Sequence, residues 1–357
     1  MRLVTYERLD HRRPRRDEDP AAWAGDSGPL RFDPMDAGRP GARRLGACPA
    51  EGPGASHVVD LNRALAMKLA VEDVGAPEAE ADALVPSDMR AFLARGDEAL
   101  AAAAAALTFV DEVLGRYDAP DLIRAGVLEP RTSVRLCAPV PRPGKIVAVA
   151  RNYPAHAAES DGAVPEEPVL FLKASSAVIG PNDDLVLPRA SREVDYEGEL
   201  AVVIGRHARE LSEHEALDCI AGYTAANDVS ARDWQSVRGQ HFIGKSLDGF
   251  APLGPMLVTR DEIDDVQDLG LETTLSGDVV QSARTKEMTF PVARIIAFVS
   301  QLMTLEPGDV LLTGTPAGVG RSRRPPRFLR DGDVVEVTIE RIGTLRNHVV
   351  DPVRGRE

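Results

Sequence analysis

The sequence predicts an α+β protein in which a small α/β N-terminal domain, residues 1–135, precedes a larger β-rich domain, residues 144–352. Three observations lead to this interpretation. The first part is rich in alanine and carries two helix-like segments, the segment 136–143 is rich in proline, and the remainder alternates short Val-, Ile- and Leu-rich runs with Gly/Pro turns. Many short apolar runs separated by turns are typical of a sandwich, roll or barrel.

The N-terminal domain is predicted to begin with a strand over residues 1–6. Residues 61–74 have the apolar period of a helix, and residues 97–114 form an alanine-rich helix. Residues 10–40 are crowded with Pro, Gly, Asp and Arg, which predicts a loop or a disordered insertion. We find no catalytic constellation of side chains in this variable domain.

The proline-rich segment 136–143 predicts a stiff extended linker, because three prolines exclude a helix. Helices after it are predicted only over residues 212–222 and 291–303. Ser212 and Glu215 have the spacing of a capping box at the start of the first of these helices. The predicted strands are the apolar runs KIVAVA, VLFLKA, LVLP, ELAVVIG, PLGPMLVT, LETTLSG, DVLLTG and DVVEVTIE.

Composition excludes several classes of protein. Of the 357 residues, 43% are apolar and 27% are charged, as in soluble globular proteins. No apolar run is long enough to span a membrane and the N-terminus has no signal-peptide core, so a cytoplasmic protein is expected. Cys48, Cys137 and Cys219 are too few and too widely spaced for a disulfide framework or a structural zinc site. The net charge of −14 argues against a nucleic-acid partner.

Glu197 and Glu199 raise a question of charge at the start of the run ELAVVIG. In a strand, side chains two residues apart point to the same face, so the two carboxylates are expected to lie side by side. Carboxylates that close repel each other unless one is protonated or a cation lies between them. On the pair alone, two exposed acids at a strand end are an equally good interpretation.

Other polar residues of the β-rich domain lie on turns, and each has an ordinary alternative. Asp228 could be a turn or helix-cap residue, and Lys245 could be a solvated loop lysine. His156 and Glu159 have the spacing of a surface pair on a helix, and Thr315 could belong to a plain turn. Turns held by a rigid scaffold are, however, where catalytic side chains are commonly found.

Five segments of this domain together resemble the fumarylacetoacetate hydrolase family: VDYEGELAVVIG, NDVSARDWQ, RNYPAHAAE, GKSLDGFAPLGP and TGTPAGVG. The order in which the chain carries them is also the family's. The resemblance covers residues 138–350 and implies the family's mixed β-sandwich or roll for the catalytic domain. The N-terminal domain resembles the small leading domain of the longer bacterial members.

The resemblance implies a metal site. In this family an E-x-E pair and a later Asp hold a divalent metal, and the matching residues are Glu197, Glu199 and Asp228. Mg²⁺ is the implied ion, with Mn²⁺ or Ca²⁺ as alternatives, and carboxylates without thiolate or imidazole suit Mg²⁺ or Mn²⁺ better than Zn²⁺. Larger eukaryotic members add an acidic ligand in the strand before the His motif. Residues 146–150 contain no acid, so this chain resembles the three-ligand type.

The resemblance also implies catalytic roles. His156 matches the family's general base, Glu159 its orienting partner and Lys245 its active-site lysine, which would stabilise a developing enolate or oxyanion or hold a substrate carboxylate. Contacts with the substrate are implied for four further residues: Tyr153, Arg232, Gln235 and Thr315.

The implied activity is metal-dependent hydrolysis of a C–C bond in a 2,4-dioxo acid of the acylpyruvate or fumarylpyruvate type. In this scheme the metal polarises the 2-oxo acid end, and the His156–Glu159 pair activates water. Decarboxylases, isomerases and hydratases of 2-oxo-enoic acids in aromatic catabolism use the same electron sink and stay alternatives. A non-catalytic binding protein of the same fold is a distant alternative. The resemblance further implies a homodimer whose ligand is a small-molecule 2-oxo acid.

Overall fold

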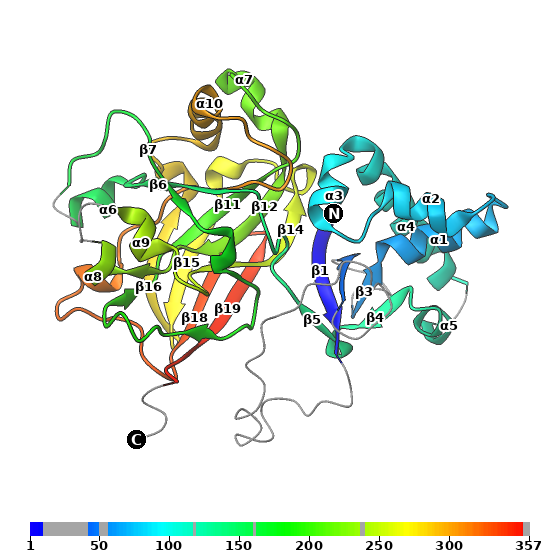
Figure 1. The fold of residues 1–357 in the computed structure, drawn as a ribbon, viewed down its shortest axis with the longest axis horizontal. Helices are drawn as coiled ribbons and strands as arrows, with labels where there is room; N and C mark the ends of the chain where they lie inside the picture. Colours follow the sequence, from blue (N-terminus) through cyan, green and yellow to red (C-terminus); the bar gives the residue numbers. More distant parts are fainter. Residues whose placement is uncertain (10–41, 50–55, 117–118, 160–161, 236–239, 353–357) are drawn as a thin grey trace.

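The structure is a computed structural model that describes residues 1–9, 42–49, 56–116, 119–159, 162–235 and 240–352. Within these residues, the main path of a twelve-stranded sheet runs β4-β3-β2-β1-β14-β12-β11-β17-β6-β7 (Figure 1). A five-stranded sheet, β16-β15-β18-β19-β9, packs on the larger sheet through β15, β18 and β19. The α+β, β-rich fold class is therefore confirmed.

The N-terminal part combines a strand group with a helical group, which lies on the right in Figure 1. Its strands are β1 (Arg2–Arg8), β2 (Arg43–Ala47), β3 (His57–Asp60), β4 (Leu128–Pro130) and β5 (Val134–Leu136). Its helices are α1 (Leu61–Val71), α2 (Pro77–Leu84), α3 (Met89–Ala94), α4 (Asp97–Leu114) and α5 (Ala119–Arg124). The predicted insertion over residues 10–40 lies outside the described residues.

The β-rich part contains the remaining strands and five of the described helices. The strands are β6 (Ile146–Ala150), β7 (Val169–Lys173), β8 (Val178–Ile179), β9 (Leu185–Val186), β10 (Val194–Asp195), β11 (Gly198–Ile204), β12 (Ile220–Asn227), β13 (Ser230–Ala231), β14 (Ala251–Thr259), β15 (Gly270–Leu275), β16 (Asp278–Arg284), β17 (Val310–Leu312), β18 (Val334–Ile339) and β19 (Gly343–Val350). The helices are α6 (Pro154–Glu159), α7 (Glu213–Ala216), α8 (Arg232–Gln235), α9 (His241–Lys245) and α10 (Val292–Leu302).

The last three residues of one predicted helix, 220–222, belong to a strand instead. The capping box of Ser212 and Glu215 is present, and the Ser212 N–H donates a 2.9 Å hydrogen bond to Glu215 Oε2. The helix α7 ends at Ala216, however, and β12 begins at Ile220, so the prediction of a helix through residue 222 is wrong. All of β12 is buried between β11 and β14, and this sheet pairing outweighs the local preference for a helix.

The N-terminal part shares a sheet with the β-rich part. Strand β1 pairs antiparallel with β14, and Leu3 lies opposite Leu257. The proline-rich segment between the two parts is packed into the core, because Ala138 and Val140 are only 2% and 1% exposed. The boundary predicted at residues 136–143 stays a prediction, since the two parts meet across a continuous sheet.

Strand β11 is buried on both faces and positions the site. Leu200 and Val202 belong to one hydrophobic cluster, whereas Ala201 and Val203 belong to another. Burial on both faces explains why the run ELAVVIG is apolar throughout rather than alternating. The strand therefore fixes the position of the carboxylates at its beginning.

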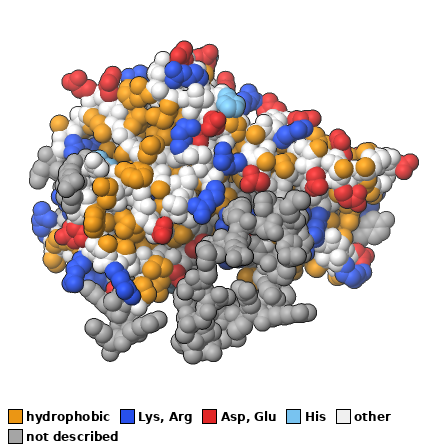
Figure 2. Space-filling model, viewed as in Figure 1, with side chains coloured by type: hydrophobic (Ala, Val, Ile, Leu, Met, Phe, Trp, Pro, Cys, Tyr) orange, Lys and Arg blue, Asp and Glu red, His pale blue; other side chains and the backbone are white. Residues whose placement is uncertain are grey.

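The surface carries charges of both signs. Figure 2 shows apolar side chains gathered over the β-rich part, with basic and acidic side chains interspersed over the same face. On this face the described residues form no uniformly basic surface of the kind that binds nucleic acid. Within the described ranges, no helix combines the length and the apolar character needed to cross a membrane.

Candidate active site

Three buried carboxylates meet where β11 and β12 lie side by side. Glu199 lies in β11 and Glu197 immediately precedes this strand, while Asp228 follows the last residue of β12. The Asp228 N–H donates a 2.8 Å hydrogen bond to the carbonyl oxygen of Glu197. Carboxylate oxygens of the three residues lie within 4.8 Å of one another, and none of the residues is more than 4% exposed.

Three buried cationic side chains contact these carboxylates. Lys245 Nζ lies 2.5 Å from Glu197 Oε2 and also donates to Asp228. Lys173 Nζ lies 2.5 Å from Asp228 Oδ1, and the Arg232 guanidinium lies 2.6 Å from Glu197 Oε1. Buried charges are costly unless they are paired and hydrogen-bonded, so the acids and cations form one interdependent group.

The surrounding charges give the two glutamates opposite properties. Burial opposes ionisation of Glu197, but attraction to Lys245 and Arg232 outweighs it and lowers the pKa of this carboxyl group. Burial and then repulsion by Asp228 and Glu197 raise the pKa of Glu199 well above its usual value. Glu199 therefore takes up a proton more readily than Glu197 does.

The donor set fits a divalent cation. All three ligands are hard oxygen donors, which Mg²⁺ and Mn²⁺ prefer. A bound cation would offset the repulsion that raises the pKa of Glu199. The Gly314 N–H donates a 2.6 Å hydrogen bond to Glu199 Oε2 and so fixes this carboxylate. Glu197, Glu199 and Asp228 could hold such an ion together.

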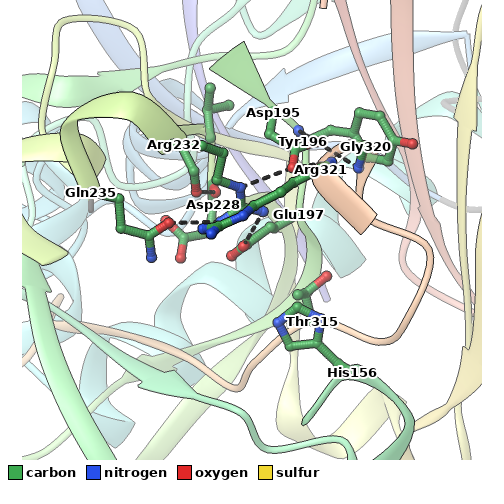
Figure 3. Close-up of polar contacts among 12 residues, drawn as sticks. His156, Asp195, Tyr196, Glu197, Asp228, Arg232, Gln235, Thr315, Gly320 and Arg321 are labelled. Atoms are coloured by element: carbon green, nitrogen blue, oxygen red, sulfur yellow. Dashed lines mark hydrogen bonds and ion pairs between the residues drawn. The ribbon is translucent and has the colours of Figure 1, made fainter. Parts of the chain in front are cut away.

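His156 and Glu159 form a hydrogen-bonded pair on α6. His156 Nδ1 lies 2.9 Å from Glu159 Oε1, and Glu159 Oε2 accepts a 2.9 Å hydrogen bond from the Gly318 N–H. A carboxylate acceptor places the proton on Nδ1, so that Nε2 carries the basic lone pair of neutral His156. Figure 3 shows the His156 ring across the site from Arg232 and Gln235.

One cavity of about 430 Å³ brings most of the predicted site residues together. Its volume lies in the usual range for small-molecule sites. Nine of the predicted residues line this cavity: His156, Glu159, Glu197, Glu199, Asp228, Arg232, Gln235, Lys245 and Thr315.

Tyr153 is the predicted site residue that does not line the cavity. Its side chain is 1% exposed and belongs to the hydrophobic cluster around β11. Burial, and then the nearby charge of Glu199, raise the pKa of the Tyr153 hydroxyl. The residue therefore lies behind the site, in the core.

Arg232, Gln235 and Thr315 are each held by other side chains. Arg232 donates a 2.9 Å hydrogen bond to Gln235 Oε1, and Gln235 Nε2 lies 2.9 Å from His241 Nδ1. Thr315 Oγ1 donates a 3.0 Å hydrogen bond to the carbonyl oxygen of Gly198 and accepts one from Gln281. The cavity wall is thus tied directly to the strand that carries the acidic pair.

Two buried charged residues of the group were missed in the sequence. Lys173 ends the apolar run VLFLK, and a lysine that closes an apolar run is an available signal for a paired charge. Asp195 stands two residues before Glu197 and is completely buried. It accepts a 2.9 Å hydrogen bond from the Arg232 Nε, and Figure 3 shows it between Arg232 and the Gly320–Arg321 backbone.

Curated relatives of this chain include two mitochondrial enzymes. The chain is 45% identical to "Oxaloacetate tautomerase FAHD2A, mitochondrial" of Homo sapiens, over 75% of this chain and 82% of the relative. It is 43% identical to "Oxaloacetate tautomerase fahd2, mitochondrial" of Xenopus laevis, over 75% of this chain and 80% of the relative.

Solved structures of similar proteins carry two different activities in their names. The fumarylacetoacetate hydrolase (EaFAH) of psychrophilic Exiguobacterium antarcticum is 37% identical with a TM-score of 0.66, and the match covers 88% of this chain and 97% of that chain. The 2-hydroxyhepta-2,4-diene-1,7-dioate isomerase of Mycobacterium marinum is 45% identical with a TM-score of 0.56, and the match covers 64% of this chain and 82% of that chain.

The family itself follows from the β-rich part. Residues 145–350 match the family model described as "Fumarylacetoacetate (FAA) hydrolase C-terminal", which is more than half of the chain. The resemblance found in the sequence motifs is confirmed by this match and by the relatives. The protein is an enzyme that belongs to the fumarylacetoacetate hydrolase family.

Proposed function

We propose that the protein is a divalent-metal-dependent isomerase that interconverts the keto and enol forms of a 2-oxo acid of the oxaloacetate type. The observation that carries the proposal is the shared cavity, into which the His156–Glu159 pair, Lys245 and the three carboxylates all open. The names of the relatives that match three quarters of the chain support tautomerisation. We therefore favour the isomerase alternative over the hydrolase activity that the sequence motifs imply.

Glu197, Glu199 and Asp228 are the residues that would hold the cation. When bound, a divalent cation supplies Lewis acidity that polarises the 2-oxo group and makes the neighbouring C3–H more acidic. The chain contributes the fixed positions of the ligands. Glu199 is held by Gly314, and Asp228 is held by Lys173.

His156 is the residue that would move the proton at C3. In the keto-to-enol direction, Nε2 of His156 takes the C3 proton, the electrons of the C3–H bond form the C2–C3 double bond, and a C2 carbonyl electron pair moves to the oxygen. The C2 oxygen then takes a proton from water, and the imidazolium gives its proton to the hydroxide that remains. Glu159 holds the imidazole through Nδ1 and stabilises the imidazolium that results. Because Glu159 also accepts from the Gly318 N–H, the base is fixed relative to the loop after β17.

Lys245 is placed to stabilise the negative charge that develops on the C2 oxygen. Its ammonium group is completely buried, and its pKa is raised because Asp228 and Glu197 outweigh the cost of burial. A charged donor in a buried site stabilises an oxyanion more strongly than the same donor in water. Arg232 is also paired with two acids, Asp195 and Glu197, and its proposed role is to position Glu197.

Hydrolysis of a C–C bond in a 2,4-dioxo acid is the second candidate. The specific observation in its favour is the His156–Glu159 pair, which suits the activation of water as well as proton transfer at carbon. The similar structure named fumarylacetoacetate hydrolase adds support, since the match covers nearly all of that chain.

A substrate panel separates the two candidates. The purified protein is assayed with oxaloacetate, acylpyruvates, fumarylpyruvate and 2-oxohept-3-enedioate, with Mg²⁺ and with EDTA. We expect Mg²⁺-dependent acceleration of enol–keto exchange in oxaloacetate and slower or absent cleavage of the dioxo acids. Efficient cleavage of an acylpyruvate without acceleration of oxaloacetate tautomerisation would replace the proposal with the hydrolase.

A further inference from the structure

The mouth of the cavity carries arginines that the proposed chemistry does not use. Arg321 and Arg324 lie on the loop after β17 and line the cavity, and both are exposed. Among the described residues, neither guanidinium has a carboxylate within 4.0 Å. Arg324 instead donates to the carbonyl oxygens of Ser322 and Arg323, at 3.5 and 3.2 Å.

The cations deeper in the cavity differ from these arginines because they are already paired. Lys245 contacts Glu197 and Asp228, and Arg232 contacts Glu197 and Asp195. Their charge is largely offset by acidic side chains. Among the described residues, the exposed arginines that line the cavity without a carboxylate within 4.0 Å are Arg151, after β6, and the two that share one loop, Arg321 and Arg324.

The loop that carries Arg321 is fixed to the carboxylate group by one buried residue. Asp195 accepts hydrogen bonds from the backbone N–H groups of Gly320 and Arg321, at 2.7 and 3.0 Å. The same carboxylate holds Arg232, which in turn contacts Glu197 (Figure 3). Asp195 is a positioning residue that sets the distance between the mouth arginines and the candidate metal ligands.

We propose that Arg321 and Arg324 bind the distal carboxylate of a dicarboxylic 2-oxo acid. The inference rests on the proposed function, in which the 2-oxo end of the substrate lies at the carboxylate group. A planar guanidinium is the side chain best suited to a carboxylate, because it offers paired donors in a fixed geometry. The cavity would thus select a substrate with an anion at each end over a monocarboxylic acid of equal length.

The test compares oxaloacetate with 2-oxobutanoate, which has the same number of carbons but a methyl group in place of the distal carboxylate. Exchange of the C3 protons in D₂O is followed by NMR for wild type, Arg321→Gln, Arg324→Gln and the double variant. Arg330→Gln is the matched control, because Arg330 is exposed, lies on the same segment and does not line the cavity.

We expect kcat/KM for oxaloacetate to fall about 10- to 100-fold in the double variant, through KM, as the loss of a charged hydrogen bond predicts. The fall for 2-oxobutanoate is expected to be at least tenfold smaller, and Arg330→Gln is expected to match wild type. An equal effect on both acids, or no effect beyond that of Arg330→Gln, overturns the inference. A loss specific to oxaloacetate in Arg151→Gln, without such a loss in the double variant, also overturns the inference, because Arg151 is another exposed arginine that lines the cavity.

Calorimetric titration separates this inference from the proposed function. If wild type accelerates proton exchange in neither acid, the proposed function is wrong. The affinity of the metal-loaded protein for oxaloacetate then tests whether Arg321 and Arg324 bind the distal carboxylate. A selective loss of oxaloacetate affinity in the double variant supports the carboxylate site. Equal affinities for wild type and the double variant overturn it.

Discussion

Lys245 Nζ lies 2.5 Å from Glu197 Oε2 in a buried site, so an ammonium group is in direct contact with a candidate metal ligand. Lys245→Met removes this charge while nearly keeping the volume. We expect the metal-free variant to unfold at a lower temperature, because Glu197 and Asp228 lose a buried partner. Mg²⁺ should then raise the unfolding temperature more than it does in wild type, since it restores the missing positive charge.

The same variant is expected to lose turnover about 10²- to 10³-fold, as removal of an oxyanion donor predicts. Thermal unfolding with and without Mg²⁺, followed by calorimetric titration of Mg²⁺, measures the first effect. Lys286→Met is the control, because Lys286 is exposed and does not line the cavity. Weaker Mg²⁺ binding in Lys245→Met than in wild type would contradict the account.

His156→Ala is expected to keep Mg²⁺ binding and to reduce turnover about 10²- to 10⁴-fold, because it removes the proton-transfer group. Glu159→Gln is expected to cost less and to change the pH dependence of turnover, since Glu159 orients the imidazole. Steady-state kinetics across a pH range, with calorimetric Mg²⁺ titration, measure both. If the pair were only structural, both variants would lower thermal stability and leave turnover per folded molecule unchanged.

Asn152 is a completely buried side chain that joins three loops, and its removal tests the structural support of the site. Its amide donates to the carbonyl oxygens of Phe290 and Thr313 at 3.0 and 2.7 Å, and its Oδ1 accepts from the Phe290 N–H at 2.7 Å. Asn152→Ala leaves these groups unsatisfied and should lower the free energy of unfolding by about 2–4 kcal/mol.

Denaturant unfolding measures this cost. Thr108→Ala is the control, because Thr108 lies on the exposed face of α4 with one hydrogen bond to its own helix. Its effect should stay within about 0.5 kcal/mol. A similar free energy of unfolding for Asn152→Ala and wild type would show that the loops are held by other contacts.

A homodimer, or a dimer of such dimers, stays a prediction drawn from the family. Closed symmetric assemblies are the commonest oligomers of soluble proteins. Sedimentation velocity at micromolar concentration measures the assembly directly. A monomer at that concentration would refute the prediction.

Only part of the carboxylate group has a local sequence signal, and Asp228 is implied by the family resemblance alone. The spacing of Glu197 and Glu199 sets their common face, and the apolar run after them predicts a buried strand. The helix α4 also matches its predicted range, because alanine favours a helix without tertiary help.

The parts that the sequence did not predict depend on contacts between distant segments. Lys173 lies 55 positions before its partner Asp228, and Asp195 binds Gly320 across 125 positions. No local pattern records such pairs. The predicted helix includes the first three residues of β12, 220–222, because their local preference is weak, and burial between two strands decides the outcome.

The position of Tyr153 also depends on packing. The family resemblance implies a contact between Tyr153 and the substrate. The structure turns its ring into the hydrophobic cluster instead, where burial of a large aromatic side chain is favourable.

Ketonisation of enol-oxaloacetate, followed by ultraviolet absorbance, measures the proposed metal-dependent tautomerase activity itself. Wild type and Glu199→Gln are compared with Mg²⁺ and with EDTA, and Mg²⁺ without protein gives the rate due to the free ion. We expect wild type to accelerate ketonisation above this rate. EDTA should abolish the acceleration, and excess Mg²⁺ should restore it. Glu199→Gln should need more Mg²⁺ than wild type, because it lacks one anionic ligand. Full acceleration by chelator-treated wild type, or wild-type Mg²⁺ dependence in Glu199→Gln, would contradict the proposed activity.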